Sequence, residues 1–413
     1  MFQLAHDDKV QTKSALAGLT GIVKLTGTST NNNNPCSNLV PHFEMIFELI
    51  SQRLFPQIPN VSKSEPQQRG KRAKPVEGEL MAGWPHVKDL SAEYQIPVLC
   101  IRFLAAFVSA LIRQHTRKQS DESSVIDLDT ISSIRSISVG FFLMHLQGLN
   151  EIAGSSNVSA SRLQYSLLKG LMTCLPDASA SDLTSYLQPL FLALQHTDQR
   201  LRYKLSTLLS RLIRNRRLSD AFLPLLFFAG AHESSLLIKS TLKALLHEII
   251  RSWPADSAII EELLPCLIVY TVKHPDYSKD FAINRDLIKG YYDYFVESVV
   301  EAANCGAIYE AVSRLKLYHF VPIDQDASNR LYFASELAQE SVKEKCASYH
   351  WPLQSGKSAN FKGSALSLLV PDVLVELDEA SQLQNIHRVF SMSMSMDSES
   401  VEDTRKRRII KRK

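Results

Sequence analysis

The chain has 413 residues, of which 45% are hydrophobic and 22% charged, and its formal net charge is +3. These values are ordinary for a soluble protein that builds a real apolar core. The longest apolar runs, such as residues 222–229, are far shorter than the roughly 20 residues that cross a bilayer. We therefore expect no membrane-spanning segment and no membrane partner.

The net charge conceals an uneven distribution. Seven of the 46 basic residues form a C-terminal cluster, here called the basic tail: Arg405, Lys406, Arg407, Arg408, Lys411, Arg412 and Lys413. The rest of the chain has 39 basic and 43 acidic residues. It is therefore not uniformly basic, as a surface that binds nucleic acid along its length would be. The six cysteines are dispersed, with no CxxC pair and no metal-ligand spacing, which indicates core thiols in a reducing compartment.

The first part of the chain, residues 1–55, is predicted to hold HEAT-like helical repeats. Residues 4–10 resemble the end of one repeat helix and its Asp turn, so the chain opens inside a repeat without the polar cap that terminal repeats need. We expect that further repeats precede it in a longer protein; the alternative is an unusual natural start. Residues 56–83 are rich in Pro, Gly, Ser and Gln and predict a disordered linker. The basic cluster at 69–74 within it is either a solvated loop or a nuclear-import or phosphate contact.

Helical periodicity dominates residues 84–360, with Pro and Asp or Asn between segments and no sustained strand alternation. The expected helices are 94–113, 131–150, 161–174, 182–195, 199–214, 222–229, 236–251, 257–273, 286–304, 308–319 and 327–347. The predicted fold class is all-α, a HEAT/armadillo-like α-solenoid. Residues 361–390 predict an irregular segment, and 391–413 a disordered Ser-rich acidic stretch followed by the basic tail.

The most informative stretch is residues 187–212. One apolar helix stops at His196-Thr197-Asp198, and a second carries a stripe of leucines on one face: Leu201, Leu205, Leu208, Leu209 and Leu212. This pattern is typical of a HEAT-type repeat, in which two short helices share an Asp turn. Neither helix can bury its stripe alone, so such pairs stack into solenoids that hold partners.

No catalytic constellation is present in the sequence. It lacks the GxxxxGK[ST], GxGxxG, HExxH and GxSxG motifs, and its histidines do not pair with Glu at metal-ligand spacing. We therefore predict no catalytic, cofactor-binding or metal-ligating residues, and a protein that is not an enzyme.

Basic residues cluster on the second helix of the 187–212 stretch and just beyond it. They are Arg200, Arg202, Lys204, Arg211, Arg214, Arg216 and Arg217, here called the basic ridge. The ridge is either a solvated face with charges that the helix dipole favours, or a docking surface for an acidic partner segment, an inositol phosphate or DNA.

An aromatic run is the second surface candidate. It consists of Tyr291, Tyr292, Tyr294 and Phe295. Tyr is favoured at binding hot spots, but residues four positions apart on one helix face would equally pack between repeats.

Several short motifs between residues 84 and 361 occur in the order and spacing of a known family. They are Trp84-Pro85-His86 before a long helix, residues 161–165 and 198–202 at repeat starts, His274-Pro275-Asp276-Tyr277 after Leu264-Pro265, and residues 328–332 with 335–339. Together they resemble the C-terminal half of the precocious-dissociation-of-sisters (Pds5-like) family, cohesin-associated HEAT-repeat regulators. The family's long N-terminal half has no counterpart here.

The resemblance implies a non-enzymatic regulator of sister chromatid cohesion that binds the cohesin ring through its kleisin subunit, with the wings-apart-like release factor as a partner. It also implies a nuclear, chromatin-associated protein that acts in the cell cycle, in mitosis and in cell division. The residue patterns alone support only a binding scaffold. A HEAT-repeat scaffold of another kind, such as a nuclear transport adaptor or a phosphatase scaffold subunit, is the alternative.

We predict that the basic tail is not part of a folded element and that its positive charge directs the protein to the nucleus. Deleting residues 404–413 should leave helical content and melting temperature unchanged, because the tail cannot bury enough apolar surface to fold. Nuclear accumulation, imaged with a fluorescent fusion, should fall. A truncated protein that still concentrates in nuclei would assign import to the 69–74 cluster or to a partner.

Overall fold

The computed structural model describes residues 11–21, 23, 38–54, 84–118, 127–151, 158–175, 180–253, 259–274, 277, 284–320, 325–353 and 374–376. Nearly all of them are helical, which confirms the all-α prediction. The chain start at 1–10, the predicted linker, the basic tail and most of the segment 361–390 lie outside the described residues.

Contacts between Cα atoms divide the chain into two compact units. Unit 1 lies within Met1–Ala178 and Pro189–Leu218, and unit 2 within Ser179–Gln188 and Ser219–Lys413. Helix α8 (Ala180–Leu194) contributes residues to both units, and its Pro189 lies inside the helix.

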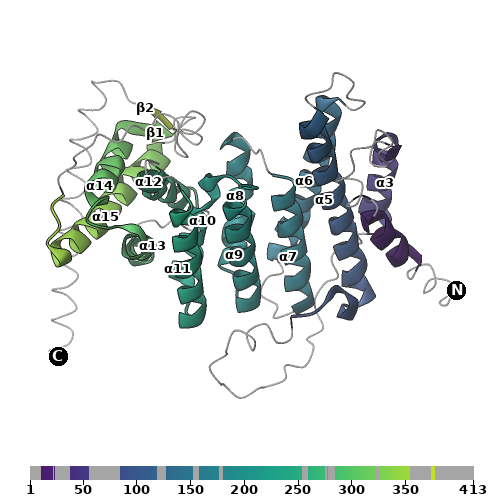
Figure 1. Cartoon of the computed structure of the whole chain (residues 1–413), viewed down its shortest axis with the longest axis horizontal. Coiled ribbons are helices and arrows are strands. Elements are labelled where there is room, and N and C mark those ends of the chain that lie inside the picture. Colours follow the sequence, from purple (N-terminus) through teal and green to yellow (C-terminus); the bar gives the residue numbers. More distant parts are fainter. Residues whose placement is uncertain are drawn as a thin grey trace, which may run out of the picture. The chain divides into compact units, whose positions relative to one another are not determined.

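Unit 1 is built mainly from helices that pack on one another (Figure 1). They are α3 (Phe43–Leu49), flanked by the 3-10 helix Val40–His42 and the π-helix Ile50–Leu54, then α5 (Ala92–Lys118), α6 (Leu128–Glu151), α7 (Val158–Thr173) and α9 (Gln199–Arg214). Helix α5 contacts both α6 and α7, and α7 also contacts α9. The apolar stripe of each helix therefore finds its cover on a neighbour.

Gly170 permits the close approach of α7 to α5 and α6. A Cβ at this position would lie 3.0 Å from the Cγ2 atom of Ile101 on α5 and 3.2 Å from the ring of Phe142 on α6. Both side chains are buried, so neither could move away easily.

Helix α5 corrects the expectation that every apolar stretch of the chain is far too short to cross a membrane. Its segment Glu93–His115 is long and apolar enough to cross a membrane, although Arg102 interrupts the apolar run and hid this length. In the structure 78% of the most apolar window is buried inside the protein, partly by α6 and α7. This burial is typical of a core helix.

After its share of α8, unit 2 resumes at Ser219 with the 3-10 helix Asp220–Phe222. Its further helices are α10 (Pro224–His232), α11 (Leu236–Arg251), α12 (Ile259–Val272), α13 (Arg285–Val299), α14 (Cys305–Arg314) and α15 (Gln325–Tyr349). Every side chain of α12 from Glu262 to Val272 is buried. Helices α10, α13, α14 and α15 all contact α12, so this helix forms the centre of the core of unit 2.

The predicted helix 308–319 was wrong at its end. Helix α14 stops at Arg314, a 3-10 helix follows at Leu315–Leu317, and strand β1 (Tyr318–Phe320) pairs antiparallel with β2 (Leu374–Glu376). The partner strand lies far along the chain, so local periodicity could not reveal the pairing.

The predicted helix 286–304 also extended too far. Helix α13 ends at Val299, and Asn304 closes a turn there: its Nδ2 donates to the Val299 carbonyl at 3.1 Å, and its Oδ1 accepts from the Glu301 N–H at 2.8 Å. Asn competes with helix formation in this way. By contrast, the helices predicted at 199–214 and 236–251 begin and end as expected.

The aromatic run on α13 belongs to the core. Tyr291, Tyr292, Tyr294 and Phe295 are all buried, which confirms the packing alternative and excludes an exposed anchor. Tyr291 shares a 2.6 Å hydrogen bond with the hydroxyl of Tyr277. Among the cysteines, the five that the structure describes are buried free thiols, as expected, and Cys36 lies outside the described residues.

The contact of α10 with α13 depends on Gly230, which yields a stability prediction. A Cβ at Gly230 would overlap the ring of Tyr294, a buried side chain that also contacts Phe227 and Lys239. Gly230→Ala should lower the free energy of unfolding by about 1–3 kcal/mol despite its better helix propensity. Urea denaturation followed by circular dichroism measures this.

Gly290→Ala on α13 is the matched control. No atom lies within 4 Å of a Cβ there, so the substitution should raise stability by up to about 1 kcal/mol. A Gly230→Ala protein as stable as the Gly290→Ala protein would contradict the packing described.

Candidate functional site

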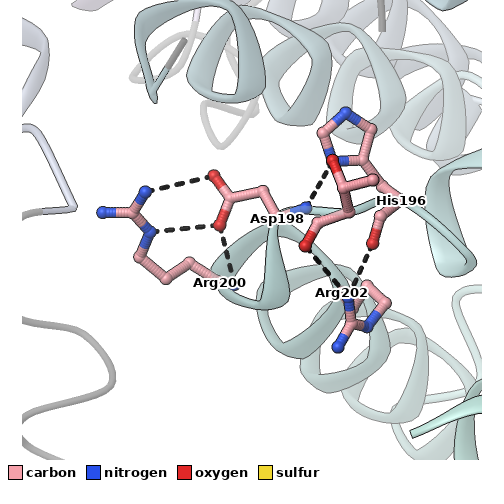
Figure 2. Close-up of polar contacts among 5 residues, drawn as sticks. His196, Asp198, Arg200 and Arg202 are labelled. Carbon is pink, nitrogen blue, oxygen red and sulfur yellow. Dashed lines mark hydrogen bonds and ion pairs between the residues drawn. The ribbon is translucent and has the colours of Figure 1, made fainter. Parts of the chain in front are cut away.

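The turn before α9 is held by the first residues of the basic ridge (Figure 2). Asp198 is the N-cap of the helix, and its Oδ1 accepts a hydrogen bond from the Arg200 N–H at 3.0 Å. The Arg200 side chain returns to the same carboxylate, with its Nε 3.1 Å from Oδ1 and its Nη2 3.4 Å from Oδ2. A bidentate pair of this kind fixes both side chains.

Arg202 stabilises the other side of the turn through hydrogen bonds to the backbone. Its Nη1 donates to the carbonyl oxygens of His196 at 2.6 Å and Thr197 at 3.3 Å, as Figure 2 shows. These carbonyls lie just after the end of α8, where helical partners run out. Arg200 and Arg202 are both half-buried. They therefore stabilise the turn, which sequence reasoning did not anticipate.

The charges within the turn are balanced inside the chain. Burial alone would raise the pKa of Asp198, but hydrogen bonds from Arg200 and Ser161 and the charge of Arg200 hold it below its ordinary value. Burial is also the main cause that lowers the pKa of His196. The Nδ1 atom of His196 accepts from the Asp198 N–H at 2.9 Å, which requires an unprotonated nitrogen.

The structure confirms the buried face of α9 but only part of its basic face as exposed. Its leucine stripe is buried as expected, and Arg211 and Arg214 are exposed. Lys204, a member of the ridge, is half-buried. The basic ridge is therefore not one continuous surface, because Arg200 and Arg202 hold the turn and only Arg211, Arg214, Arg216 and Arg217 are exposed to solvent.

The end of α9 has an unusual residue at its left-handed position. The Arg217 N–H donates to the Leu212 carbonyl and the Arg216 N–H to the Ile213 carbonyl, each at 2.9 Å, which is the hydrogen-bond pattern of a Schellman motif. Arg216 has a φ of 54°, where glycine is the usual residue. An arginine there is strained, and such strain tends to persist at functional positions.

A cavity of about 790 Å³ lies among α5, α7 and the C-terminal end of α9. We call it the basic cavity because seven basic residues line it. They are Arg102 and Arg113 from α5, Arg162 and Lys169 from α7, and Arg211, Arg216 and Arg217 from α9 and the following turn. No Asp or Glu is among the described residues that line it. An anion is therefore the complementary ligand.

The cations of the basic cavity influence one another. Burial lowers the pKa of Arg162, and the nearby charge of Arg102 lowers it further. Burial raises the pKa of Tyr165, while Arg162, Arg211 and Arg102 oppose that shift. These three arginines, from α7, α9 and α5, thus act on the same hydroxyl group.

Aromatic rings hold Arg162 in place. Its guanidinium carbon lies 5.4 Å from the ring centre of Tyr165 and 5.6 Å from that of Trp84, and the two rings meet edge to face at 5.9 Å. This arrangement is a cation–π contact. Trp84, which the sequence singled out only as part of a motif, thereby supports a basic side chain of the cavity.

The structure brings together three residues of the ridge, Arg211, Arg216 and Arg217, with four that the sequence did not single out for binding: Arg102, Arg113, Arg162 and Lys169. The four lie on helices remote in sequence, so no local pattern groups them. The basic tail and the 69–74 cluster lie outside the described residues.

Backbone strain at Arg216 yields a prediction about stability. Arg216→Gly relieves the left-handed strain, whereas Arg216→Ala removes the same guanidinium but keeps a Cβ at that φ. The glycine variant should be more stable than the alanine variant by about 1 kcal/mol, measured by urea denaturation. Equal stabilities would show that the position is not strained.

The comparisons with known proteins agree with the motifs of the sequence. The family described as sister chromatid cohesion protein PDS5 matches residues 73–359, which is more than half of the chain and includes helices α5 to α15. No curated protein matches the chain. The matched range contains the turn at Asp198, helix α9 and the basic cavity. The chain therefore belongs to the PDS5 family of sister chromatid cohesion proteins.

Proposed function

We propose that the chain is a cohesin-associated regulator of sister chromatid cohesion, a HEAT-repeat scaffold that binds the cohesin ring through its kleisin subunit. The family match over the helical repeats carries this proposal. The protein acts without catalysis, in the nucleus and on chromatin, through mitosis and cell division. The wings-apart-like release factor is its second partner.

The charges at the site support a particular contact surface. Arg200 and Arg202 are committed to the turn before α9, so they have little left to offer a partner. Arg211, Arg216 and Arg217 are exposed and line the cavity. We assign the contact with an acidic kleisin segment to these three residues, because a guanidinium pairs with a carboxylate bidentately.

The experiment is a pull-down with the full chain from chromatin extract, followed by mass spectrometry. Kleisin and the cohesin ATPase subunits should be recovered with the chain. Recovery mainly with Ran-type GTPases or phosphatase catalytic subunits, without kleisin, would contradict the proposal.

Charge reversals then locate the contact. The combination Arg211→Glu, Arg216→Glu and Arg217→Glu should abolish kleisin recovery, whereas Lys88→Glu, Arg214→Glu and Arg251→Glu change the net charge equally at exposed positions outside the cavity and should preserve it. Exposed substitutions usually change stability by less than about 0.5 kcal/mol, so both proteins should stay folded. Leu205→Asp should instead unfold the repeat, since it buries an unpaired charge.

A further inference from the structure

We propose that the basic cavity is a binding site for a peptide segment in which a phosphoserine or phosphothreonine lies next to an apolar side chain. The chemistry of the ligand follows from the cavity alone. Only the suggestion that such a segment could belong to a cohesin subunit rests on the proposed function. Phosphorylation of the partner would then regulate its attachment to this scaffold.

The charge of the cavity favours a phosphate over a single carboxylate. Seven basic residues line the cavity, and the described lining residues include no acid. Arg113 already donates its Nε to the Ser109 carbonyl at 3.0 Å, but its charge still contributes. A phosphate brings a charge of about −1.5 to −2 and three acceptor oxygens in the space of one side chain. Acidic neighbours in the same segment would supply the remaining negative charge.

The position of Arg162 indicates a prepared anion site. Its Nε atom is buried and makes no hydrogen bond. The rings of Trp84 and Tyr165 hold the guanidinium, so a ligand would not have to order this side chain. Arg102 lies close enough to repel it, and an anion between the two would relieve that repulsion. Arginine forks match the geometry of phosphate oxygens.

The apolar part of the lining distinguishes a peptide from other phosphate-bearing ligands. Its apolar side chains are Ile101, Ala105, Ala106, Ile112, Met172, Leu208 and Leu212. An inositol polyphosphate has no apolar group to cover them. The volume of about 790 Å³ lies within the usual range for enclosed ligands, whereas a DNA duplex is bound along an open, charged surface. A short peptide with an apolar side chain next to its phosphorylated residue complements both the basic and the apolar lining residues.

The strained end of α9 agrees with a binding role. A glycine at position 216 would relieve the strain of the left-handed residue, yet the chain carries an arginine whose side chain lines the cavity. Arg216→Gly should therefore weaken binding without destabilising the protein relative to Arg216→Ala. A fold-only role for Arg216 would show no change in binding for either variant.

The test is fluorescence polarisation with the full chain and a labelled peptide, Asp-Glu-Leu-phosphoSer-Leu-Glu-Asp. We expect saturable binding that is roughly tenfold or more tighter than that of the unphosphorylated peptide, as charged hydrogen bonds predict. Replacing both leucines of the peptide with alanine should weaken binding as well. Inositol hexakisphosphate and a short DNA duplex are the competing probes.

Two variants on the same helix provide the matched pair. Arg211→Glu, in the cavity, should reduce affinity for the phosphopeptide roughly tenfold or more, whereas Arg214→Glu, exposed in the same last turn but outside the lining, should retain it. Circular dichroism checks that both are folded.

Three outcomes would overturn the proposal. The first is equal affinity for the phosphorylated and unphosphorylated peptides. The second is equal loss of binding in Arg211→Glu and Arg214→Glu, which would indicate general attraction to positive charge. The third is tighter binding of inositol hexakisphosphate or DNA than of the phosphopeptide, together with indifference to the leucines. Failure to recover kleisin in the pull-down would leave these peptide results unaffected.

Discussion

The packing of α5 on α7 brings the exposed Arg102 near the half-buried Arg162, and the pKa of Arg162 is lowered first by its own burial and then by the charge of Arg102. Like charges repel, and the repulsion grows as water is removed. The apolar contacts around Gly170, Ile101 and Phe142 hold the helices together against it. The site is therefore positively charged before any ligand arrives, and an anion that enters gains both its own attraction and the relief of that repulsion.

Helix α9 has two ends with opposite arrangements. At its N-terminus, Asp198 complements the helix dipole and neutralises Arg200, so this end needs nothing from outside the chain. At its C-terminus, Arg211, Arg216 and Arg217 turn toward a cavity whose described lining contains no acid. The same helix thus stabilises the turn of its repeat at one end and carries exposed positive charge at the other. For a PDS5-family scaffold, the residues that maintain the fold are thus separate from those that we propose to bind a partner.

The sequence predicted the repeat turn and the helix that follows it well, because these features depend on near neighbours. The leucine period and Asp198 located helix α9 at its observed bounds, and the buried stripe was assigned to the correct face. Features that join distant segments were missed. Nothing near Arg211 reveals that Arg102 and Arg162 come to lie beside it, and nothing near Tyr318 reveals Glu376 opposite it. Arg200 and Arg202 were assigned to the ridge because charge alone does not show whether an arginine is already paired.

A double-mutant cycle tests directly whether the cavity arginines contact a bound phosphate. The cycle combines Arg211→Gln in the protein with replacement of phosphoserine by serine in the peptide, and the four dissociation constants come from calorimetry. If the guanidinium contacts the phosphate, the two changes should be coupled by about 1.5–3 kcal/mol, the range for hydrogen bonds between charged groups. Strictly additive effects, with a coupling energy near zero, would contradict a direct contact and the account of the cavity built on it.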